Sequence, residues 1–323
     1  MPTVAAIDVG TNTVRLLVAD AEGPGAYRVR HQEQAITRLG EGLEGTGRLA
    51  PAAIERTVAA VARYAAAARH LGAVAVRAVA TSAAREAANR EAFLAAAAAA
   101  GCAVTVVDPE EEARLTTLGA LHLLPRRGGR CLVIDIGGGS TEFTLTAGSA
   151  PRQSVSLPLG VVKLTERLFR EDPPPAEARA ACAAHVREAG AVRKAVAAGV
   201  PFQPPLRSVE AIGTGGTATT LAALELGLDP YDGDRVTGYR LGVGRIRGLL
   251  HRLAATPLGA RQRLPGLEPG RADVIVAGTS LLAEALDVLG FDGCTVTDGG
   301  LREGILLDTL ARRLAPAGPR PGG

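Results

Sequence analysis

One short pattern occurs twice in this chain and restricts the fold more than any other feature. Residues 4–13 run Val-Ala-Ala-Ile-Asp-Val-Gly-Thr-Asn-Thr, and residues 132–141 run Leu-Val-Ile-Asp-Ile-Gly-Gly-Gly-Ser-Thr. In each copy an apolar run ends near an aspartate, Asp8 or Asp135, a glycine-containing turn follows, and a second apolar run begins. Each copy predicts a β-hairpin with a polar tip. Two hairpin-led α/β halves predict a duplicated domain with a cleft between the copies.

The remaining segments alternate between strand and helix patterns in both halves. We expect first-half strands at residues 4–9, 14–19, 27–36, 74–80 and 102–107, a loop at 39–49, and helices at 51–72, 83–100 and from 109 onward. We expect second-half strands at residues 131–136, 141–147, 152–157, 209–212 and 294–297, and helices at 273–289 and 299–314. The first domain is then 1–125 and the second 126–302, with a closing helix at 303–314 that rejoins the first domain and a disordered tail at 315–323.

Composition excludes several classes of function. The chain has 323 residues, which suffices for two domains, and only 3% aromatic residues with no Trp, which argues against a stacking platform for single-stranded nucleic acid. The net charge of +3, on 36 basic and 33 acidic residues, is too balanced to predict a nucleic-acid or membrane partner. The N-terminus lacks a signal-peptide pattern and the four cysteines are widely spaced, so we expect a cytoplasmic protein.

Three glycine-rich segments carry the features of phosphate-binding loops. Glycine allows close approach of the backbone to an anion, and successive N–H groups form a nest for phosphate oxygens. Ordinary hairpin turns are the alternative for each loop taken alone, but two matched copies favour phosphate binding. The third segment, 213–217, follows a strand and opens a helix, which is also an anion-site arrangement. The candidate phosphate-binding residues of the loops are Gly10, Thr11, Asn12, Thr13, Gly137, Gly138, Gly139, Ser140, Thr141, Gly215, Gly216 and Thr217.

Acidic residues near these loops are candidate metal ligands. If the loops face each other, Asp8 and Asp135 point into one cleft, and Mg²⁺ prefers a few carboxylates together with water and substrate phosphate. Glu142 begins the return strand of the second hairpin and would approach the same ion, although an exposed strand carboxylate is the alternative. Mn²⁺ is the alternative metal.

The remaining charged candidates have weaker support from position alone. Arg15 and Arg85 lie close to the loops and would grip phosphate, with a surface role as the alternative. Asp108 has the position of a helix N-cap and Glu111 that of its capping-box partner, which leaves Glu112 without an obvious structural task. Helix geometry by itself does not make Glu112 catalytic.

Six segments in order, 6–16, 80–87, 111–115, 134–142, 213–217 and 271–273, together resemble the exopolyphosphatase/guanosine pentaphosphate phosphohydrolase (Ppx/GppA) family. The resemblance implies two ribonuclease-H-like domains of the actin/sugar-kinase/Hsp70 superfold, with the active site in the interdomain cleft. It implies that Glu112 is the base that orients or deprotonates the attacking water and that Asp135 and Glu142 are metal-associated. It also implies that the glycine loops cradle phosphates and that Arg15 and Arg85 hold them.

Longer members of that family carry a helical HD-type domain, for which residues 1–323 leave no room. We therefore expect a Mg²⁺-dependent exopolyphosphatase that releases terminal orthophosphate from short polyphosphate chains. Guanosine pentaphosphate 5′-phosphohydrolase activity is the first alternative, since the motifs serve both substrates. A kinase or ATPase of the same superfold and a non-catalytic sensor of alarmone or polyphosphate are the others. The resemblance also suggests a homodimer.

Overall fold

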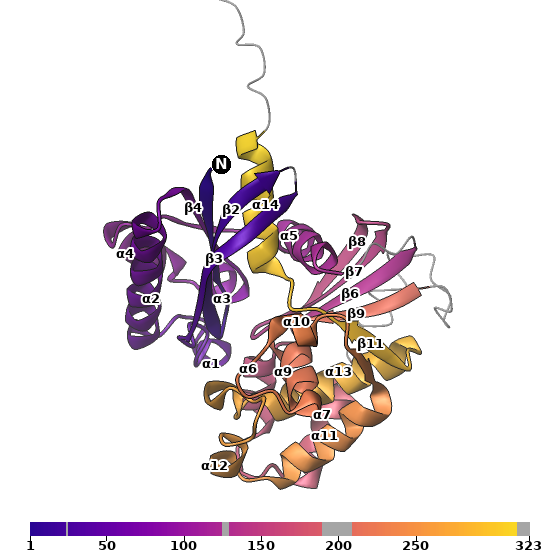
Figure 1. Ribbon diagram of the computed structural model, residues 1–323. Helices are drawn as coiled ribbons and strands as arrows, with labels where there is room; N and C mark the ends of the chain where they lie inside the picture. The colour runs from indigo at the N-terminus through magenta and orange to yellow at the C-terminus, as the bar shows by residue number, and fades with distance from the viewer. Residues whose placement is uncertain (24, 125–128, 189–208, 315–323) are drawn as a thin grey trace, which may run out of the picture.

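The computed structural model of the protein describes residues 1–23, 25–124, 129–188 and 209–314. These residues form two lobes, each built on its own β-sheet (Figure 1). The predicted tail at 315–323 and the predicted domain boundary at 125/126 lie outside the described residues. Within the described ranges, no helix is long and apolar enough to cross a membrane.

The first sheet has the strand order β3-β2-β1-β4-β5. Its strands are β1 (Thr3–Val9), β2 (Thr13–Gly23), β3 (Ala26–Ile36), β4 (Ala73–Ala80) and β5 (Val104–Val106). β1, β2 and β3 form an antiparallel meander, while β4 runs parallel to β1 and β5 parallel to β4. The helices that follow are α1 (Leu43–Thr46), α2 (Pro51–His70), α3 (Ser82–Glu86), α4 (Arg90–Ala99) and α5 (Pro109–His122).

The second sheet repeats this order and adds one edge strand. Its strands are β6 (Arg130–Ile136), β7 (Thr141–Ala147), β8 (Ala150–Leu157), β9 (Val209–Thr214), β10 (Arg240–Gly242) and β11 (Gly293–Val296). The order β8-β7-β6-β9-β11 matches that of the first sheet, and β10 pairs antiparallel with β11 at the edge. The helices are α6 (Val161–Leu168), α7 (Ala176–Glu188), α9 (Gly215–Leu226), α10 (Gly233–Val236), α11 (Val243–Ala255), α12 (Leu258–Arg261), α13 (Ile275–Leu289) and α14 (Leu301–Leu314), with a 3₁₀ turn at Pro269–Arg271. This repeated topology is that of the predicted two-domain, actin-like α/β fold.

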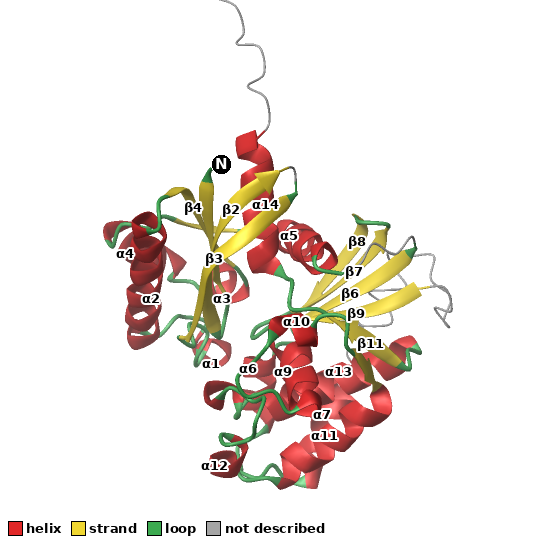
Figure 2. Cartoon of the chain, viewed as in Figure 1, coloured by secondary structure: helices red, strands yellow, loops and turns green. Residues whose placement is uncertain are grey.

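The alternation of residues along the central strands decides which way the two aspartates point. On β1, Ala5 and Ile7 pack toward α2 and α4, whereas Val4 and Ala6 pack toward α5 and α14 on the opposite face. Side chains two residues apart share one face of a strand, so Asp8 shares the face of Val4 and Ala6. Figure 2 shows α2 and α4 on one side of the first sheet and α5 and α14 on the other.

The second sheet repeats this arrangement. Val133 of β6 packs with Ala120 of α5, so Asp135, two residues further along, faces the same helix. α5 therefore lies between the two sheets, and both aspartates approach it from opposite sides.

α5 and α14 cross closely because both carry glycine at the contact. A Cβ atom added to Gly119 would lie 1.9 Å from the Gly300 carbonyl oxygen, and one added to Gly304 would lie 1.8 Å from that of Leu115. Such distances leave no room for a side chain at either position unless the two helices move apart. α14 thus packs on α5 and on the first sheet through Ile305, Leu306 and Leu310.

The predicted single helix at 83–100 is wrong. α3 ends at Glu86, Ala87 is extended, and α4 begins at Arg90. The side-chain amide of Asn89 accepts a hydrogen bond from the Leu49 N–H (2.8 Å) and donates one to the Leu49 carbonyl (3.0 Å). This long-range pairing overrides the helical propensity of the alanines. The predicted loop at 39–49 also contains the single turn α1, and the strand predicted at 102–107 is shorter.

Candidate active site

The two hairpin tips have the same backbone geometry. The Gly10 N–H donates to the Thr13 carbonyl at 3.0 Å, and the Gly137 N–H donates to the Ser140 carbonyl at 2.9 Å. Asp8 pairs with Arg15 across β1 and β2, and Asp135 pairs with Glu142 across β6 and β7. The duplication therefore places an arginine in one hairpin where the other has a glutamate.

Each tip is held from behind by the segment that follows the third strand of its sheet. The Gly40 N–H donates to the Thr11 carbonyl at 2.9 Å, and the Val162 N–H donates to the Gly138 carbonyl at 2.9 Å. Within the described ranges, the N–H groups of Gly138 and Gly139 donate to no carbonyl. The tips thus have carbonyls already engaged and N–H groups available, which suits an anion.

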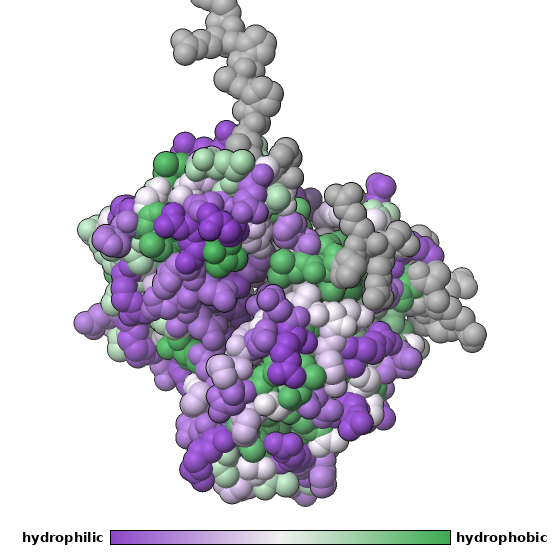
Figure 3. All heavy atoms as spheres, viewed as in Figure 1, coloured by the Kyte–Doolittle hydropathy of each residue, from purple (hydrophilic) through white to green (hydrophobic). Residues whose placement is uncertain are grey.

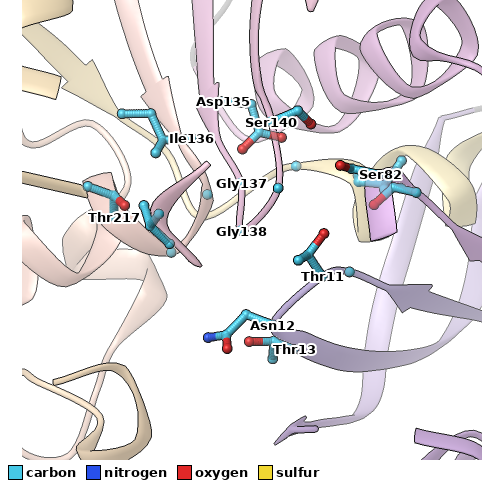
Figure 4. A pocket seen from close by; sticks show the side chains of 18 of the residues that line it. Thr11, Asn12, Thr13, Ser82, Asp135, Ile136, Gly137, Gly138, Ser140 and Thr217 are labelled. Carbon is cyan, nitrogen blue, oxygen red and sulfur yellow. The ribbon is translucent and has the colours of Figure 1, made fainter. Parts of the chain in front are cut away.

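The tips of the two hairpins face each other across the cleft, as Figure 4 shows for Thr11 to Thr13 and Gly137 to Gly138. A Cβ atom on Gly138 would lie 2.9 Å from the Thr11 Cβ, and one on Gly139 would lie 2.4 Å from the Ser82 Oγ. Glycine is required here because the lobes approach each other so closely.

A cavity of about 100 Å³ lies between these tips. On the face drawn in Figure 3, hydrophilic residues cover most of the first lobe beside the junction of the two lobes. The predicted site residues that line the cavity are Asp8, Gly10, Thr11, Asn12, Thr13, Arg15, Glu112, Asp135, Gly137, Gly138, Gly139, Ser140, Gly215, Gly216 and Thr217. The structure thus brings together residues from the predicted hairpins, the third glycine loop and the start of α5.

Glu112 reaches the cavity from the first turn of α5. The Asp108 carboxylate caps this helix by accepting a hydrogen bond from the Glu111 N–H (2.8 Å), which confirms the predicted N-cap. The Glu111 carboxylate binds Arg114, whereas Glu112 is buried and lines the cavity. The side chain of Arg85 donates to Glu112 Oε2 (2.9 Å) and to the Val107 carbonyl (2.9 Å).

The electrostatic surroundings of Glu112 favour a proton acceptor. Burial raises the pKa of Glu112 to about 8, the Glu142 carboxylate adds to this rise, and Arg85 opposes it. Burial and the nearby Asp135 likewise raise the pKa of Glu142. A buried carboxyl with a raised pKa is a common feature of general bases.

Three predicted site residues do not line the cavity. Arg85 lies behind Glu112 and orients it rather than facing the cavity directly. Thr141 is buried, and its hydroxyl donates to the Leu159 carbonyl, so it holds the segment after β8 instead of a ligand. Glu142 accepts a hydrogen bond from the Ser156 hydroxyl at 2.7 Å.

Two of the three carboxylates that the sequence predicts as metal ligands line the cavity. Among the described residues, no group of three acidic, histidine or cysteine side chains is placed to hold a metal ion. Asp8 and Asp135 do line the same cavity. Glu142 does not line the cavity, but it lies close enough to Asp135 for that carboxylate to raise its pKa.

Asp8 and Asp135 have the character of ligands for a hard cation. Burial raises the pKa of Asp8 to about 6, with Arg15 opposing the rise and Asp135 adding to it. Burial also raises the pKa of Asp135. Two neighbouring buried carboxylates destabilise each other's charge, and a divalent cation would relieve that cost. The donor set therefore fits Mg²⁺ or Mn²⁺ with water and substrate phosphate as the other ligands.

Sequence reasoning missed Arg271, Thr81 and Ser82, which also line the cavity. A Cβ atom on Gly216 would lie 1.8 Å from Arg271 Nη1, so the guanidinium lies against the third glycine loop. Burial lowers the pKa of Arg271, as does the adjacent Arg15. The sequence identifies 80–87 and 271–273 as separate motifs, but nothing in their spacing shows that they meet.

The glycine of the third loop is also required by its surroundings. Gly215 has φ of +79°, and a Cβ atom there would lie 2.4 Å from Asp135 Oδ1. The loop backbone therefore touches both the second aspartate and Arg271, which closes the cavity on the side of the second lobe.

Comparison with known proteins gives consistent matches over nearly the whole chain. The profile of the Ppx/GppA phosphatase family matches residues 18–313. Exopolyphosphatase 2 of Mycobacterium tuberculosis (strain ATCC 25618 / H37Rv) is 37% identical over 324 residues, which cover 94% of this chain and 97% of that protein. The crystal structure of the Aquifex aeolicus Ppx/GppA family member is 34% identical with a TM-score of 0.79, covering 98% and 99% of the two chains. An exopolyphosphatase from Cytophaga hutchinsonii has a TM-score of 0.84 at 26% identity, covering 95% and 98%.

Proposed function

Since the chain belongs to the Ppx/GppA phosphatase family, we propose that it is an exopolyphosphatase that hydrolyses the terminal phosphoanhydride bond of short inorganic polyphosphate. One observation carries the proposal. The buried carboxylate of Glu112 opens into a small cavity that is also lined by glycine loops with available N–H groups, by Asp8 and Asp135, and by Arg15 and Arg271. Positioning and charge neutralisation supply most of the catalysis in phosphoryl transfer, and this cavity offers both.

In the proposed reaction, the oxygen of a water molecule attacks the terminal phosphorus. The Glu112 carboxylate accepts a hydrogen bond from that water and takes its proton as the P–O bond forms. The bond from phosphorus to the bridging oxygen breaks, and its electron pair stays on the shortened polyphosphate chain. Orthophosphate is the other product. Arg85 orients Glu112 by its hydrogen bond to Oε2, which directs the other carboxylate oxygen toward the water.

The phosphate groups are held by backbone and guanidinium donors in this proposal. The N–H groups of Gly138 and Gly139 bind non-bridging oxygens, and the charges of Arg15 and Arg271 offset those of the substrate. Asp8 and Asp135 would hold a divalent cation, for which Mg²⁺ is our first choice and Mn²⁺ the second. When bound, the cation supplies further neutralisation of phosphate charge.

A second candidate substrate, guanosine pentaphosphate, is favoured by a neighbouring cavity. This second cavity, of about 590 Å³, shares Arg15 and Arg271 with the first. Its lining combines apolar residues, among them Leu228 and Leu267, with Tyr231 and with charges of both signs. Such a mixed lining suits a nucleoside, whereas a continuous phosphate chain needs excess positive charge.

A cytoplasmic location and a homodimer complete the proposal, on the sequence expectations given above. Size-exclusion chromatography with light scattering measures the oligomeric state directly.

The experiment that tests the function measures orthophosphate released, with Mg²⁺, from tripolyphosphate, long polyphosphate and guanosine pentaphosphate. The Glu112→Gln variant is the control, because the amide cannot take the proton while its size is unchanged. Release from tripolyphosphate that disappears in Glu112→Gln supports the proposal. Release from the nucleotide alone supports the second candidate. Release from none of them contradicts both and favours a sensor or a kinase.

A further inference from the structure

The backbone of Arg38 is strained in a way that calls for an explanation. Its φ of +53° is the one left-handed value among the non-glycine residues that the structure describes. Residues other than glycine, asparagine and aspartate rarely adopt this backbone conformation, because their Cβ atom comes close to the following carbonyl oxygen. Strain of this kind persists where the surroundings impose it, most often near functional sites.

The main chain around Arg38 holds the first phosphate loop. The N–H groups of Thr37 and Arg38 both donate to the Asn12 carbonyl, at 3.1 and 3.0 Å, and the Gly40 N–H donates to Thr11. The left-handed turn at Arg38 allows consecutive N–H groups to converge on one carbonyl. The same turn sends the Arg38 side chain away from the first lobe.

That side chain crosses to the second lobe. Arg38 Nη1 donates to Asp273 Oδ2 at 2.7 Å, and Nη2 donates to the Gly270 carbonyl at 3.3 Å. Asp273 Oδ1 is buried without a hydrogen-bond partner among the described residues. Loss of the arginine would therefore leave a partly buried carboxylate poorly compensated.

The segment to which the Arg38 side chain hydrogen-bonds is the turn that contains Arg271, which lines the cavity. Arg271 lies between Gly270 and Asp273, the two residues that bind the Arg38 guanidinium. Neighbouring contacts reinforce the same junction, since Gln34 Nε2 donates to Glu268 (2.9 Å), and Glu268 accepts a hydrogen bond from Arg271 Nε (2.7 Å). One arginine thus joins the backbone of the first phosphate loop to the turn that presents a phosphate-binding side chain from the other lobe.

We propose that Arg38 is a positioning residue that sets Arg271 against the substrate in register with the Thr11–Asn12 loop. This inference rests on the proposed function, because it assumes that Arg271 binds phosphate. Arg38 itself does not line the cavity and acts only through Arg271 and Asp273.

A second ion pair between the lobes provides a matched control. Lys163 Nζ lies 2.7 Å from Glu86 Oε2, the same separation as in the Arg38–Asp273 pair, but it does not contact the turn at 268–273. If Arg38 merely held the lobes together, Lys163→Met and Arg38→Met would have similar consequences for Arg271. If Arg38 positions Arg271, only Arg38→Met will act through it.

The first test is a double-mutant cycle for binding of tripolyphosphate, by calorimetry with Mg²⁺ in the Glu112→Gln protein, which we expect not to hydrolyse the ligand. We expect Arg38→Met to weaken binding about fivefold, an effect of about 1 kcal/mol. In the Arg271→Met protein the same substitution should change affinity less than about twofold. Lys163→Met should have the same effect with and without Arg271. An Arg38→Met effect that adds in full to that of Arg271→Met would overturn the inference.

The second test needs no substrate. Hydrogen exchange of the amides at 271–274 should become faster in Arg38→Met and remain unchanged in Lys163→Met. Arg38→Gly guards against a folding defect, because glycine adopts the left-handed backbone without strain. We expect this variant to keep its melting temperature and still lose affinity. Unchanged exchange at 271–274 in both Arg38 variants would reject the positioning role even if the protein proved to have no polyphosphatase activity.

Failure of the inference and failure of the proposed function are distinguishable. If the wild-type protein releases phosphate but the effects of the Arg38 and Arg271 substitutions are additive, the proposed function stands and the positioning role of Arg38 is rejected. If Arg38→Met speeds hydrogen exchange at 271–274 but the wild-type protein hydrolyses no polyphosphate, the structural coupling stands and the proposed function is rejected.

Discussion

The pKa of Glu112 gives the most specific prediction, because two neighbours affect it in opposite directions. Burial raises this pKa to about 8, Glu142 adds to the rise and Arg85 opposes it. Glu112 accepts a proton only when ionised, so kcat/KM should increase with pH through the apparent pKa of this residue. Glu142→Gln removes a negative charge and should move that limb of the profile to lower pH. Arg85→Met removes a positive charge and a hydrogen bond and should move it to higher pH.

The expected magnitude follows from the energy of one ionic neighbour. An interaction of about 1.4 kcal/mol corresponds to one pH unit, and we expect a displacement of about that size for each variant. If the pKa of Glu112 fell from about 8 to about 7, the ionised fraction at neutral pH would rise from about a tenth to about a half. Relative to its own plateau, the kcat/KM of Glu142→Gln at neutral pH should therefore be about fivefold higher.

The assay is a pH profile of kcat/KM with tripolyphosphate at saturating Mg²⁺ for wild type, Glu142→Gln and Arg85→Met. kcat/KM is the appropriate parameter because it reports ionisation in the free enzyme. The test is the direction in which each variant moves the profile relative to the wild type. The assignment of Glu112 as the base would be refuted if the profiles of Glu142→Gln and Arg85→Met moved in the same direction. It would also be refuted if neither profile moved while both variants still hydrolysed the substrate.

Three further outcomes follow from the cleft and the helix crossing. Burial raises the pKa of Asp8 to about 6, so the free energy of unfolding decreases as pH rises through that value and the carboxyl ionises. Asp8→Asn removes this charge and should stabilise the metal-free protein at neutral pH by about 2–3 kcal/mol in thermal unfolding while reducing activity. In Gly216→Ala the new methyl group would meet Arg271, so we expect KM to rise about tenfold with little change in melting temperature. Gly304→Ala should lower the unfolding free energy by about 1–3 kcal/mol, because its Cβ would meet a backbone carbonyl of α5. Gly248→Ala, with open space around it, is the control for both and should be neutral or slightly stabilising.

The duplicated fold was predictable because it rests on local patterns. An apolar run that ends at Asp8 or Asp135 can form a buried central strand, and the following glycines permit the hairpin turn. The observed hairpins agree with the predicted ranges within a few residues, and both sheets repeat one strand order. The loops that line the cavity follow directly from these hairpins.

Interactions between distant segments explain what the sequence did not predict. The break after α3 depends on Asn89 pairing with Leu49, which no helix pattern encodes. Glu142 is predicted beside the cavity, but it does not line it, and the Ser156 hydroxyl of the neighbouring strand donates to its Oε1. Arg271 enters the cavity from a turn in the second lobe that its sequence position does not relate to Asp8 or Gly137.

The role of Glu112 is tested most simply by the initial rate of orthophosphate release from tripolyphosphate, with Mg²⁺, in wild type and in Glu112→Gln. Glu112→Gln should unfold at a temperature no lower than that of the wild type, because it removes a buried carboxylate with a raised pKa. It should bind the substrate with similar affinity. We expect steady release by the wild type and a fall of at least about a hundredfold in Glu112→Gln, the loss typical of a missing general base. Wild-type turnover by a folded Glu112→Gln protein would show that this carboxylate does not activate the attacking water.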